Sequence, residues 1–316
     1  MNAQLATPNS QLLLGTRGSA LALVQTELVK AALHSAHPAL GVEHVVIQTT
    51  GDLRPDLRLG GATPGIDKAV WVRELEAALA TGQIHAAVHS AKDIPADRPQ
   101  GFRLAACLAR ADAFDVLISK HRSGLGGLPA SAAVATSSVR RQRQLLRLRP
   151  DLRVIEMRGN VPTRLRKLAA DSSLDALVLA KAGLDRLEVA ADEFHLTTLE
   201  SPEFLPAAGQ GIIALEVFGD DPGRDAILAA INHEDTWITL TAERELLRML
   251  GAGCSTPIAL HTCREGGLRH LHVRLFDEQD ATMPPAEARS SGAVDDPHGL
   301  AAEAARQLKL PIARDA

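Results

Sequence analysis

The sequence predicts an α/β protein of two or three domains, with a separate small α+β domain at its C-terminal end. A chain of 316 residues is too long for one ordinary core, because a typical domain has about 100 to 200 residues. Short apolar runs alternate with segments of helical periodicity through the first two thirds of the chain, as in parallel or mixed sheets covered by helices. Aromatic residues make up only 3% of the chain and Tyr is absent, so Leu, Val, Ile and Ala must fill the cores.

Strand-like and helix-like segments follow each other in a regular order. Strands are expected where a short run is mainly apolar, and helices where apolar residues recur with helical periodicity. The expected strands are residues 11–14, 42–49, 84–88, 116–118, 154–157, 174–179 and 212–217, and the expected helices are residues 21–35, 69–80, 140–148, 161–170, 225–231 and 236–250. After Gly251 we expect strands at 258–262 and 268–276 and a helix at 300–308, with linkers at 123–129 and 218–223.

The charge balance and the cysteine content exclude several classes of protein. The net charge is −4, whereas a surface that follows nucleic-acid phosphates needs an excess of Lys and Arg. The longest apolar runs, such as residues 174–180, are far shorter than the roughly 20 residues that cross a bilayer, and residues 1–10 lack an export pattern. Cys107, Cys254 and Cys263 lack the spacing of a zinc site or a disulfide framework. We therefore expect a cytoplasmic protein with no metal, nucleic-acid or membrane partner.

Basic residues gather at three turns that lead from an expected strand into a helix. These turns are residues 16–19, 136–142 and 158–164. Free N–H groups at a helix N-terminus bind anions, and arginine forks grip carboxylates with two hydrogen bonds. One such turn alone would fit simple helix capping. Three of them in an acidic chain predict a polyanionic small molecule held in a cleft between sheets.

A strand-like segment at residues 85–95 ends in a second kind of candidate. It runs into Lys92 and Asp93 at its carboxyl end, where open α/β sheets usually present active-site side chains. An exposed ion pair at a strand end is the alternative. His85 and His89 would share a strand face and have no accompanying Glu, so packing or hydrogen bonding is favoured over metal binding.

The thiol of Cys254 is the third candidate, because it lies in a Gly-rich segment between a long expected helix and an expected strand. Glycine on its N-terminal side permits tight backbone turns and leaves the sulfur accessible. The neighbouring residues do not form the Cys-His-Asn pattern of a hydrolase. Either the loop is a structural turn or the thiol has a different covalent role.

Taken in this order, the motifs closely resemble those of the hydroxymethylbilane synthase family, which is also called the porphobilinogen deaminase family. The similarity runs from about residue 13 to residue 262 and weakens through the C-terminal segment. Five collinear motifs are far more specific together than any one alone. They are residues 89–95 (HSAKDIP), residues 136–142 (TSSVRRQ), Arg158-Gly159-Asn160 with Arg164, residues 205–211 (LPAAGQG), and Gly253-Cys254 with Pro257.

The resemblance implies an α/β fold with two lobes similar to those of a periplasmic solute-binding protein, each with a mixed sheet, and a small α+β third domain. Domain 1 would comprise residues 1–110 and 206–230, domain 2 residues 111–205, and domain 3 residues 231–316. The active site would lie between the first two domains, and the third would carry Cys254. The family precedent is a monomer.

The resemblance also implies a reaction. Cys254 would hold a dipyrromethane cofactor through a thioether, and four porphobilinogen units would be added before a linear tetrapyrrole is released on the route to haem. Asp93 matches the catalytic aspartate, because loss of ammonia leaves an electron-poor azafulvene and a carboxylate can stabilise the positive charge that develops on pyrrole nitrogens. Each porphobilinogen brings two carboxylates, which explains the arginines. The instability of the product makes uroporphyrinogen III synthase a conceivable transient partner.

Motif positions assign two sets of binding residues by similarity. The cofactor-binding set is Cys254, Lys92, Asp93, Ser138, Arg140 and Arg141. The substrate-binding set is Arg17, Ser19, Lys68, Trp71, Thr136, Arg158, Arg164 and Gln210. For Gln210, which lies in a Gly-Gln-Gly turn before a strand that returns to domain 1, a hinge role is an equal alternative.

The main departure from the family lies between residues 54 and 71. Family members usually have a Gly-Gly-Lys-Gly-Leu-Phe-like lid, whereas residues 66–71 read IDKAVW, so that Lys68 is kept without its flanking glycines. Trp71 replaces an aromatic residue and can still stack on pyrroles. Two alternatives stay open: a non-catalytic two-lobed binder of a small polycarboxylate, and a diverged paralogue with an altered lid.

Overall fold

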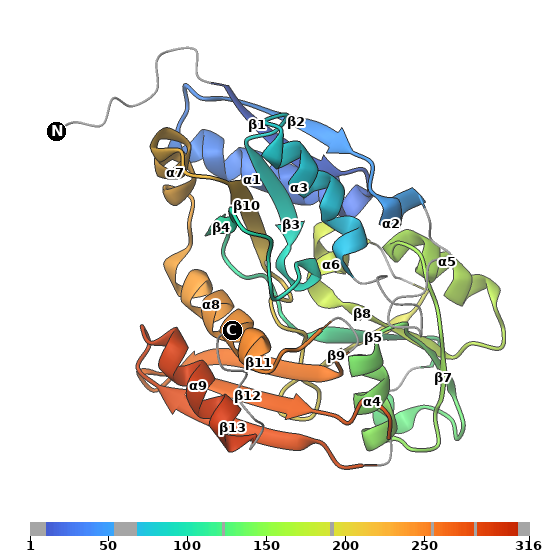
Figure 1. Cartoon of the computed structure of the whole chain (residues 1–316). Helices are drawn as coiled ribbons and strands as arrows, with labels where there is room; N and C mark the ends of the chain where they lie inside the picture. Colours follow the sequence, from blue (N-terminus) through green and yellow to red (C-terminus); the bar gives the residue numbers. More distant parts are fainter. Residues whose placement is uncertain are drawn as a thin grey trace. The chain divides into compact units, whose positions relative to one another are not determined.

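The computed structural model describes residues 11–53, 68–121, 124–189, 193–253, 256–280 and 283–308. The chain divides into two compact units, the first formed by residues 1–111 and 212–240 and the second by residues 112–211 and 241–316. The described residues contain one five-stranded sheet in the first unit, and a five-stranded and a three-stranded sheet in the second (Figure 1). The separate third domain stays a prediction.

A mixed sheet with helices on both faces forms the first unit. Its strands are β1 (Gln11–Arg17), β2 (Gly41–Ile47), β3 (Ala86–Ser90), β4 (Phe102–Cys107) and β10 (Ile213–Phe218). Its helices are α1 (Ala20–Ala36), α2 (Thr50–Leu53), α3 (Arg73–Ala80) and α7 (Pro222–Ala229), with the short 3-10 turns η1 (Lys68–Trp71) and η2 (Ala91–Asp93). The strand order is β2–β1–β3–β10–β4, and only β10 runs antiparallel to its neighbours.

Alternate side chains of β1 enter two different cores. Leu12 and Leu14 pack with Val29 and Leu33 of α1. Leu13 packs on the opposite side, in the core that contains residues of α3. The run of consecutive leucines in the sequence therefore marks a strand that is covered on both faces.

The larger sheet of the second unit is also mixed. Its strands are β5 (Asp115–Ser119), β6 (Ala133–Ala135), β7 (Arg153–Ile155), β8 (Ala176–Ala180) and β9 (His195–Leu199). Its helices are α4 (Val139–Leu148), α5 (Val161–Ala170) and α6 (Lys181–Arg186), with the short turn η3 (Leu125–Gly127). The order is β7–β6–β8–β5–β9, and β5 is antiparallel to both β8 and β9.

The two five-stranded sheets have the same topology. In each, the first strand of a parallel trio lies between the second and the third, and an antiparallel strand from outside that run separates the third strand from the last. The inserted strand is β10 in the first sheet and β5 in the second. The predicted fold class, α/β with mixed sheets in two similar lobes, is confirmed.

The three-stranded sheet near the C-terminus is entirely antiparallel. It consists of β11 (Ile258–Glu265), β12 (Leu268–Leu275) and β13 (Ala286–Gly292). Helix α9 (Pro297–Gln307) and the later part of α8 (Glu234–Met249) contribute Leu300, Ala304 and Leu246 to one core with this sheet. This arrangement is the α+β element that the sequence predicts after Gly251.

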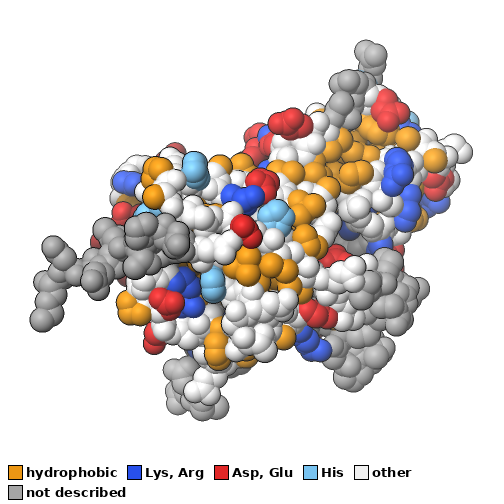
Figure 2. All heavy atoms as spheres, turned by 90° about the horizontal axis from the view of Figure 1, so that it is seen from above, with side chains coloured by type: hydrophobic (Ala, Val, Ile, Leu, Met, Phe, Trp, Pro, Cys, Tyr) orange, Lys and Arg blue, Asp and Glu red, His pale blue; other side chains and the backbone are white. Residues whose placement is uncertain are grey.

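Among the helices of the described residues, none combines the length and the apolar character that crossing a membrane requires. The face drawn in Figure 2 shows acidic and basic side chains interspersed, with no continuous basic surface among its described residues. This mixture agrees with the net charge of −4.

Candidate ligand-binding and active site

The turn between β1 and α1 places Arg17 and Ser19 at the carboxyl edge of the first sheet. Arg17 is the last residue of β1, and the Ser19 hydroxyl caps α1 by accepting a hydrogen bond from the Ala22 N–H at 3.3 Å. This cap explains why the helix begins here. The Arg17 guanidinium donates to Asp52 from Nε at 3.1 Å and from Nη2 at 2.5 Å. The sequence alone does not single out Asp52.

A pocket of about 70 Å³ lies at the carboxyl ends of β1 and β3. Four predicted residues from separate segments line it: Arg17, Ser19, Trp71 and Asp93. Gln25 and Ser90 line it as well, and Gln25 Nε2 donates to Ser90 Oγ at 2.8 Å. Gln25 is only 3% exposed. The sequence signal for Gln25 was a long polar side chain on the buried face of α1, beside Ala22, Thr26 and Val29.

Asp93 lies in the turn η2 directly after the buried strand β3. It is half-buried, lines the pocket, and has no hydrogen-bond or ion-pair partner among the described residues. Its carboxylate can therefore accept N–H groups of a ligand and stabilise a positive charge there. Lys92 lies in the same turn but is not among the residues that line the pocket.

A buried contact between a histidine ring and a glutamate side chain adjoins this pocket. His89 lines the pocket, and its Nε2 lies 3.1 Å from Oε2 of Glu216 on β10, with His89 only 5% exposed and Glu216 fully buried. Burial raises the pKa of the neighbouring Glu76 carboxyl, and the negative charge of Glu216 raises it further. The contact agrees with the expected packing or hydrogen-bonding role of His89. Glu216 was missed because it lies within an apolar strand.

In the second unit, the N-terminal turn of α4 brings predicted residues together around Asp115. Ser138 caps the helix by accepting from the Arg141 N–H at 3.4 Å, and buried Thr136 accepts from the Ser138 N–H at 3.2 Å. Arg141 donates to Asp115 from Nε at 3.0 Å and Nη2 at 2.7 Å, and Arg140 Nη2 forms an ion pair with it at 2.8 Å. Burial acts to raise the pKa of Asp115, but the two cations outweigh it and hold the pKa at about 2.

The N-terminal turn of α5 carries the second pair of predicted arginines. Asn160 caps the helix, Arg158 precedes it, and Arg164 follows within it. Arg158 Nε donates to Glu156 at 2.7 Å. Burial lowers the pKa of Arg164, and the positive charges of Arg141 and Arg158 lower it further, to about 10. The lowered pKa means that an anion beside Arg164 would stabilise its charged form.

These contacts leave a local excess of positive charge around Arg140, Arg141 and Arg164. Arg140 and Arg141 share the carboxylate of Asp115, and no ion pair of Arg164 is found among the described residues. A buried charge without a counter-ion is energetically costly, and guanidinium groups bind carboxylates through bidentate hydrogen bonds. The cluster therefore fits a ligand with carboxylate groups.

Gln210 is fully buried within the second unit. Its Nε2 donates to the Ala113 carbonyl at 2.7 Å and to Asp115 Oδ1 at 3.0 Å. Gly209 and Gly211 on either side have positive φ values of 68° and 87°, which glycine adopts without strain. These contacts favour the alternative in which Gln210 acts at a hinge, and its role in substrate binding stays a prediction.

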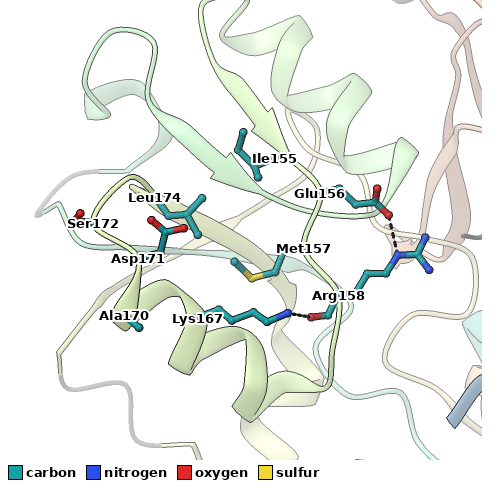
Figure 3. A pocket seen from close by; sticks show the side chains of 9 residues that line it. All are labelled: Ile155, Glu156, Met157, Arg158, Lys167, Ala170, Asp171, Ser172 and Leu174. Atoms are coloured by element: carbon teal, nitrogen blue, oxygen red, sulfur yellow. Dashed lines mark hydrogen bonds and ion pairs between the residues drawn. The ribbon is translucent and has the colours of Figure 1, made fainter. Parts of the chain in front are cut away.

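A larger open hollow of about 530 Å³ lies beside β7 and α5, and Arg158 is the one predicted site residue among its lining residues. Figure 3 shows the Lys167 side chain reaching from α5 to the Arg158 carbonyl oxygen, with the Arg158 guanidinium turned toward Glu156. Met157 and Leu174 supply apolar lining. The hollow therefore adjoins the arginine turn of α5 and is not the pocket that holds Asp93.

Two predicted residues cannot be placed. Cys254 lies outside the described residues, and Lys68 is described only by its backbone in η1. Within the part of the chain that the structure describes, no group of three or more His, Cys, Asp or Glu side chains is arranged to hold a metal ion.

Comparison with known families gives two matches that together span most of the chain. Residues 12–225 match a family model described as porphobilinogen deaminase, dipyromethane cofactor binding domain. Residues 237–309 match the porphobilinogen deaminase C-terminal domain.

Curated relatives are similar over nearly their whole length. A porphobilinogen deaminase of Nitrobacter hamburgensis is 44% identical over 302 residues, covering 94% of this chain and 92% of the relative. One of Roseiflexus sp. is 42% identical, covering 94% of this chain and 95% of the relative. Among solved structures, the reduced OxyR regulatory domain of Pseudomonas aeruginosa aligns with 72% of this chain and 96% of its own at 14% identity and a TM-score of 0.41, which is too low to support an argument.

Proposed function

This chain belongs to the porphobilinogen deaminase family, and on that premise we propose that it joins four porphobilinogen molecules head to tail, with loss of ammonia, and releases hydroxymethylbilane. It is a transferase of porphyrin and haem biosynthesis. The observation that supports this function best is the Asp93 carboxylate, which has no partner among the described residues and lies in a pocket that Arg17 and Ser19 also line. A non-catalytic binder has no need of a carboxylate there, and relatives with the enzyme's name match throughout.

Asp93 is the proposed catalytic residue. Its carboxylate accepts hydrogen bonds from pyrrole N–H groups and stabilises the positive charge that develops on their nitrogens when a carbon–carbon bond forms. Among the described residues Asp93 has no hydrogen-bond partner, so no contact with those residues has to be displaced by a ligand N–H group. The half-buried position strengthens its interaction with a cation compared with bulk water.

The family match of the first two lobes is to a dipyrromethane-cofactor-binding domain. We propose that Cys254 forms the thioether to this cofactor and that Lys92, Asp93, Ser138, Arg140 and Arg141 bind it. When bound, dipyrromethane supplies the nucleophilic pyrrole carbon to which the substrate is joined. The excess positive charge around Asp115 can balance the carboxylates of the dipyrromethane cofactor.

Substrate binding is proposed for residues on both units: Arg17, Ser19, Lys68, Trp71, Thr136, Arg158, Arg164 and Gln210. We also propose the division into three domains, at residues 1–110 with 206–230, 111–205 and 231–316. We further propose that the protein is a cytoplasmic monomer and that it binds uroporphyrinogen III synthase transiently.

The direct test is the mass of the peptide that contains Cys254. In protein from cells that make porphobilinogen, we expect this peptide to carry the mass of two pyrrole units, and the intact protein to give a coloured product with Ehrlich's reagent. Cys254→Ser should lack both, whereas Cys263→Ser should keep both. An unmodified Cys254 in active wild-type protein would exclude the thioether, and absence of bilane from modified protein would exclude the reaction.

A further inference from the structure

The Arg17 guanidinium is held along one edge by Asp52. The hydrogen bonds leave from Nε and Nη2, the side edge of the guanidinium, and end on the two different carboxylate oxygens. Asp52 is itself fixed, because its Oδ2 accepts a hydrogen bond from the hydroxyl of the buried Thr49 at 2.7 Å. Because the Asp52 carboxylate is itself held in place, it holds the Arg17 guanidinium in one position.

The guanidinium carbon of Arg17 lies over the Trp71 ring. The distance from Arg17 Cζ to the ring centroid is 5.4 Å, within the range of a cation–π contact. The indole rests on Gly51, where an added Cβ would lie 2.0 Å from Nε1 of the ring. Gly51 thus lets the ring approach the helix that carries Asp52, so one short segment supplies both contacts.

Among the residues that the structure describes, these two contacts leave the end of the Arg17 guanidinium without a partner. A guanidinium has five N–H groups, and Asp52 takes one from Nε and one from Nη2. The remaining edge, formed by Nη1 and Nη2, is the edge that grips a second carboxylate with two hydrogen bonds. Arg17 and Trp71 both line the pocket that contains Asp93.

We propose that Asp52 and Trp71 are positioning residues that fix Arg17 so that its free edge receives a carboxylate of porphobilinogen. This inference rests on the proposed function. A fixed fork loses less rotational freedom when it binds than an unrestrained side chain does, which lowers the cost of binding. The alternative is that Asp52 competes with the substrate for Arg17. The contact with Asp52 argues against this competition, because it uses the side edge of the guanidinium and leaves the end edge for the substrate.

Steady-state kinetics of the full-length, cofactor-loaded enzyme separate the two ideas. For Asp52→Asn we expect the KM for porphobilinogen to rise about tenfold while kcat changes by less than about twofold, because a charge-assisted contact to Arg17 is lost before chemistry begins. Asp52→Glu should restore part of the KM. Trp71→Leu should raise the KM more than Trp71→Phe does, because only an aromatic ring supports the cation.

A matched control exists in the second unit. Asp151 accepts from Arg149 through the same side edge, Nε at 2.7 Å and Nη2 at 2.8 Å, and lines neither pocket. Asp151→Asn removes an equivalent Arg–Asp pair and should leave the KM unchanged. As a readout other than turnover, calorimetric titration with porphobilinogen in an Asp93→Asn background should show the same weakening when Asp52→Asn is added.

The outcomes are distinct. A wild-type enzyme that makes no bilane refutes the proposed function. An active wild type whose Asp52→Asn variant keeps its KM refutes positioning alone. A lower KM for Asp52→Asn shows competition and also refutes positioning. A fall in kcat at an unchanged KM refutes positioning as well.

Discussion

Nη2 of Arg141 lies 2.7 Å from the carboxylate of Asp115, and neither side chain is more than 8% exposed. Arg140 contacts the other carboxylate oxygen, so Asp115 is enclosed by two cations. The arginines that the sequence assigns to a ligand thus already have one internal partner. That partner fixes their geometry and neutralises only part of their charge.

Removing this carboxylate should strongly destabilise the second unit. Asp115→Asn leaves two buried guanidinium groups without a counter-ion, and we expect a loss of about 3 kcal/mol in the free energy of unfolding. Urea unfolding followed by circular dichroism measures it. The exposed pair of Asp151 with Arg149 is the control, and Asp151→Asn should cost much less. Equal losses in both variants would show that burial of Asp115 has no energetic consequence.

The pH dependence of stability should carry the same signature. The pKa of Asp115 is lowered on folding from 3.8 to about 2, so its stabilising contribution is complete above 3.8 and is lost as the pH falls toward 2. The wild type should therefore lose stability through this window, and Asp115→Asn should lose less. Unfolding curves at pH 5, 4 and 3 test this, and parallel slopes for the two proteins would contradict it.

Arg164→Gln should separate stability from function. Burial and two neighbouring cations lower the pKa of Arg164 to about 10, so its charge is poorly accommodated before a ligand binds. Removing it should change the free energy of unfolding by less than about 1 kcal/mol, while bilane formation falls by more than about tenfold. Measuring both the free energy of unfolding and the turnover of this variant tests the prediction. A variant that is much less stable would indicate a structural role instead.

His272 on β12 should make the C-terminal sheet sensitive to acid. Burial lowers its pKa, and Arg274 and Arg289 lower it further, from 6.5 to about 4. Between these values the unfolded chain binds a proton that the folded chain does not, so stability falls as the pH decreases, by at most about 1.4 kcal/mol per pH unit from this group. His272→Gln should reduce the slope measured between pH 7 and pH 5, whereas exposed His298→Gln should not.

Thiol labelling should distinguish the cysteines. Cys107 is fully buried and burial raises the pKa of its thiol to about 12, whereas Cys263 is exposed. Iodoacetamide at pH 8 should therefore modify Cys263 and spare Cys107 in the native protein. With the proposed thioether formed, Cys254 should also be spared, and Cys263→Ser should then leave no reactive thiol. Mass spectrometry of the labelled peptides reads out each site.

The sequence predicted helices and strands where their buried residues leave an apolar pattern along the chain. The leucines of β1 and the apolar run of β8 are found as strands, and the helices expected at 140–148 and 161–170 are found at Val139–Leu148 and Val161–Ala170. Strands β4, β6, β9 and β13 were missed. β6 has only three residues, and β13 reads AEARSSG, whose polar residues give no strand signal.

By itself the sequence determined which residue types stand at the strand-to-helix turns, because caps, glycines and arginines act within a few positions of each other. It did so for Arg17, Asp93, Arg141 and Arg164. Only the tertiary structure decided what these side chains meet: Asp52 lies 35 residues from Arg17, and Asp115 lies 26 residues from Arg141. Such pairs form only when strands and helices from separate segments pack, and no local pattern records them.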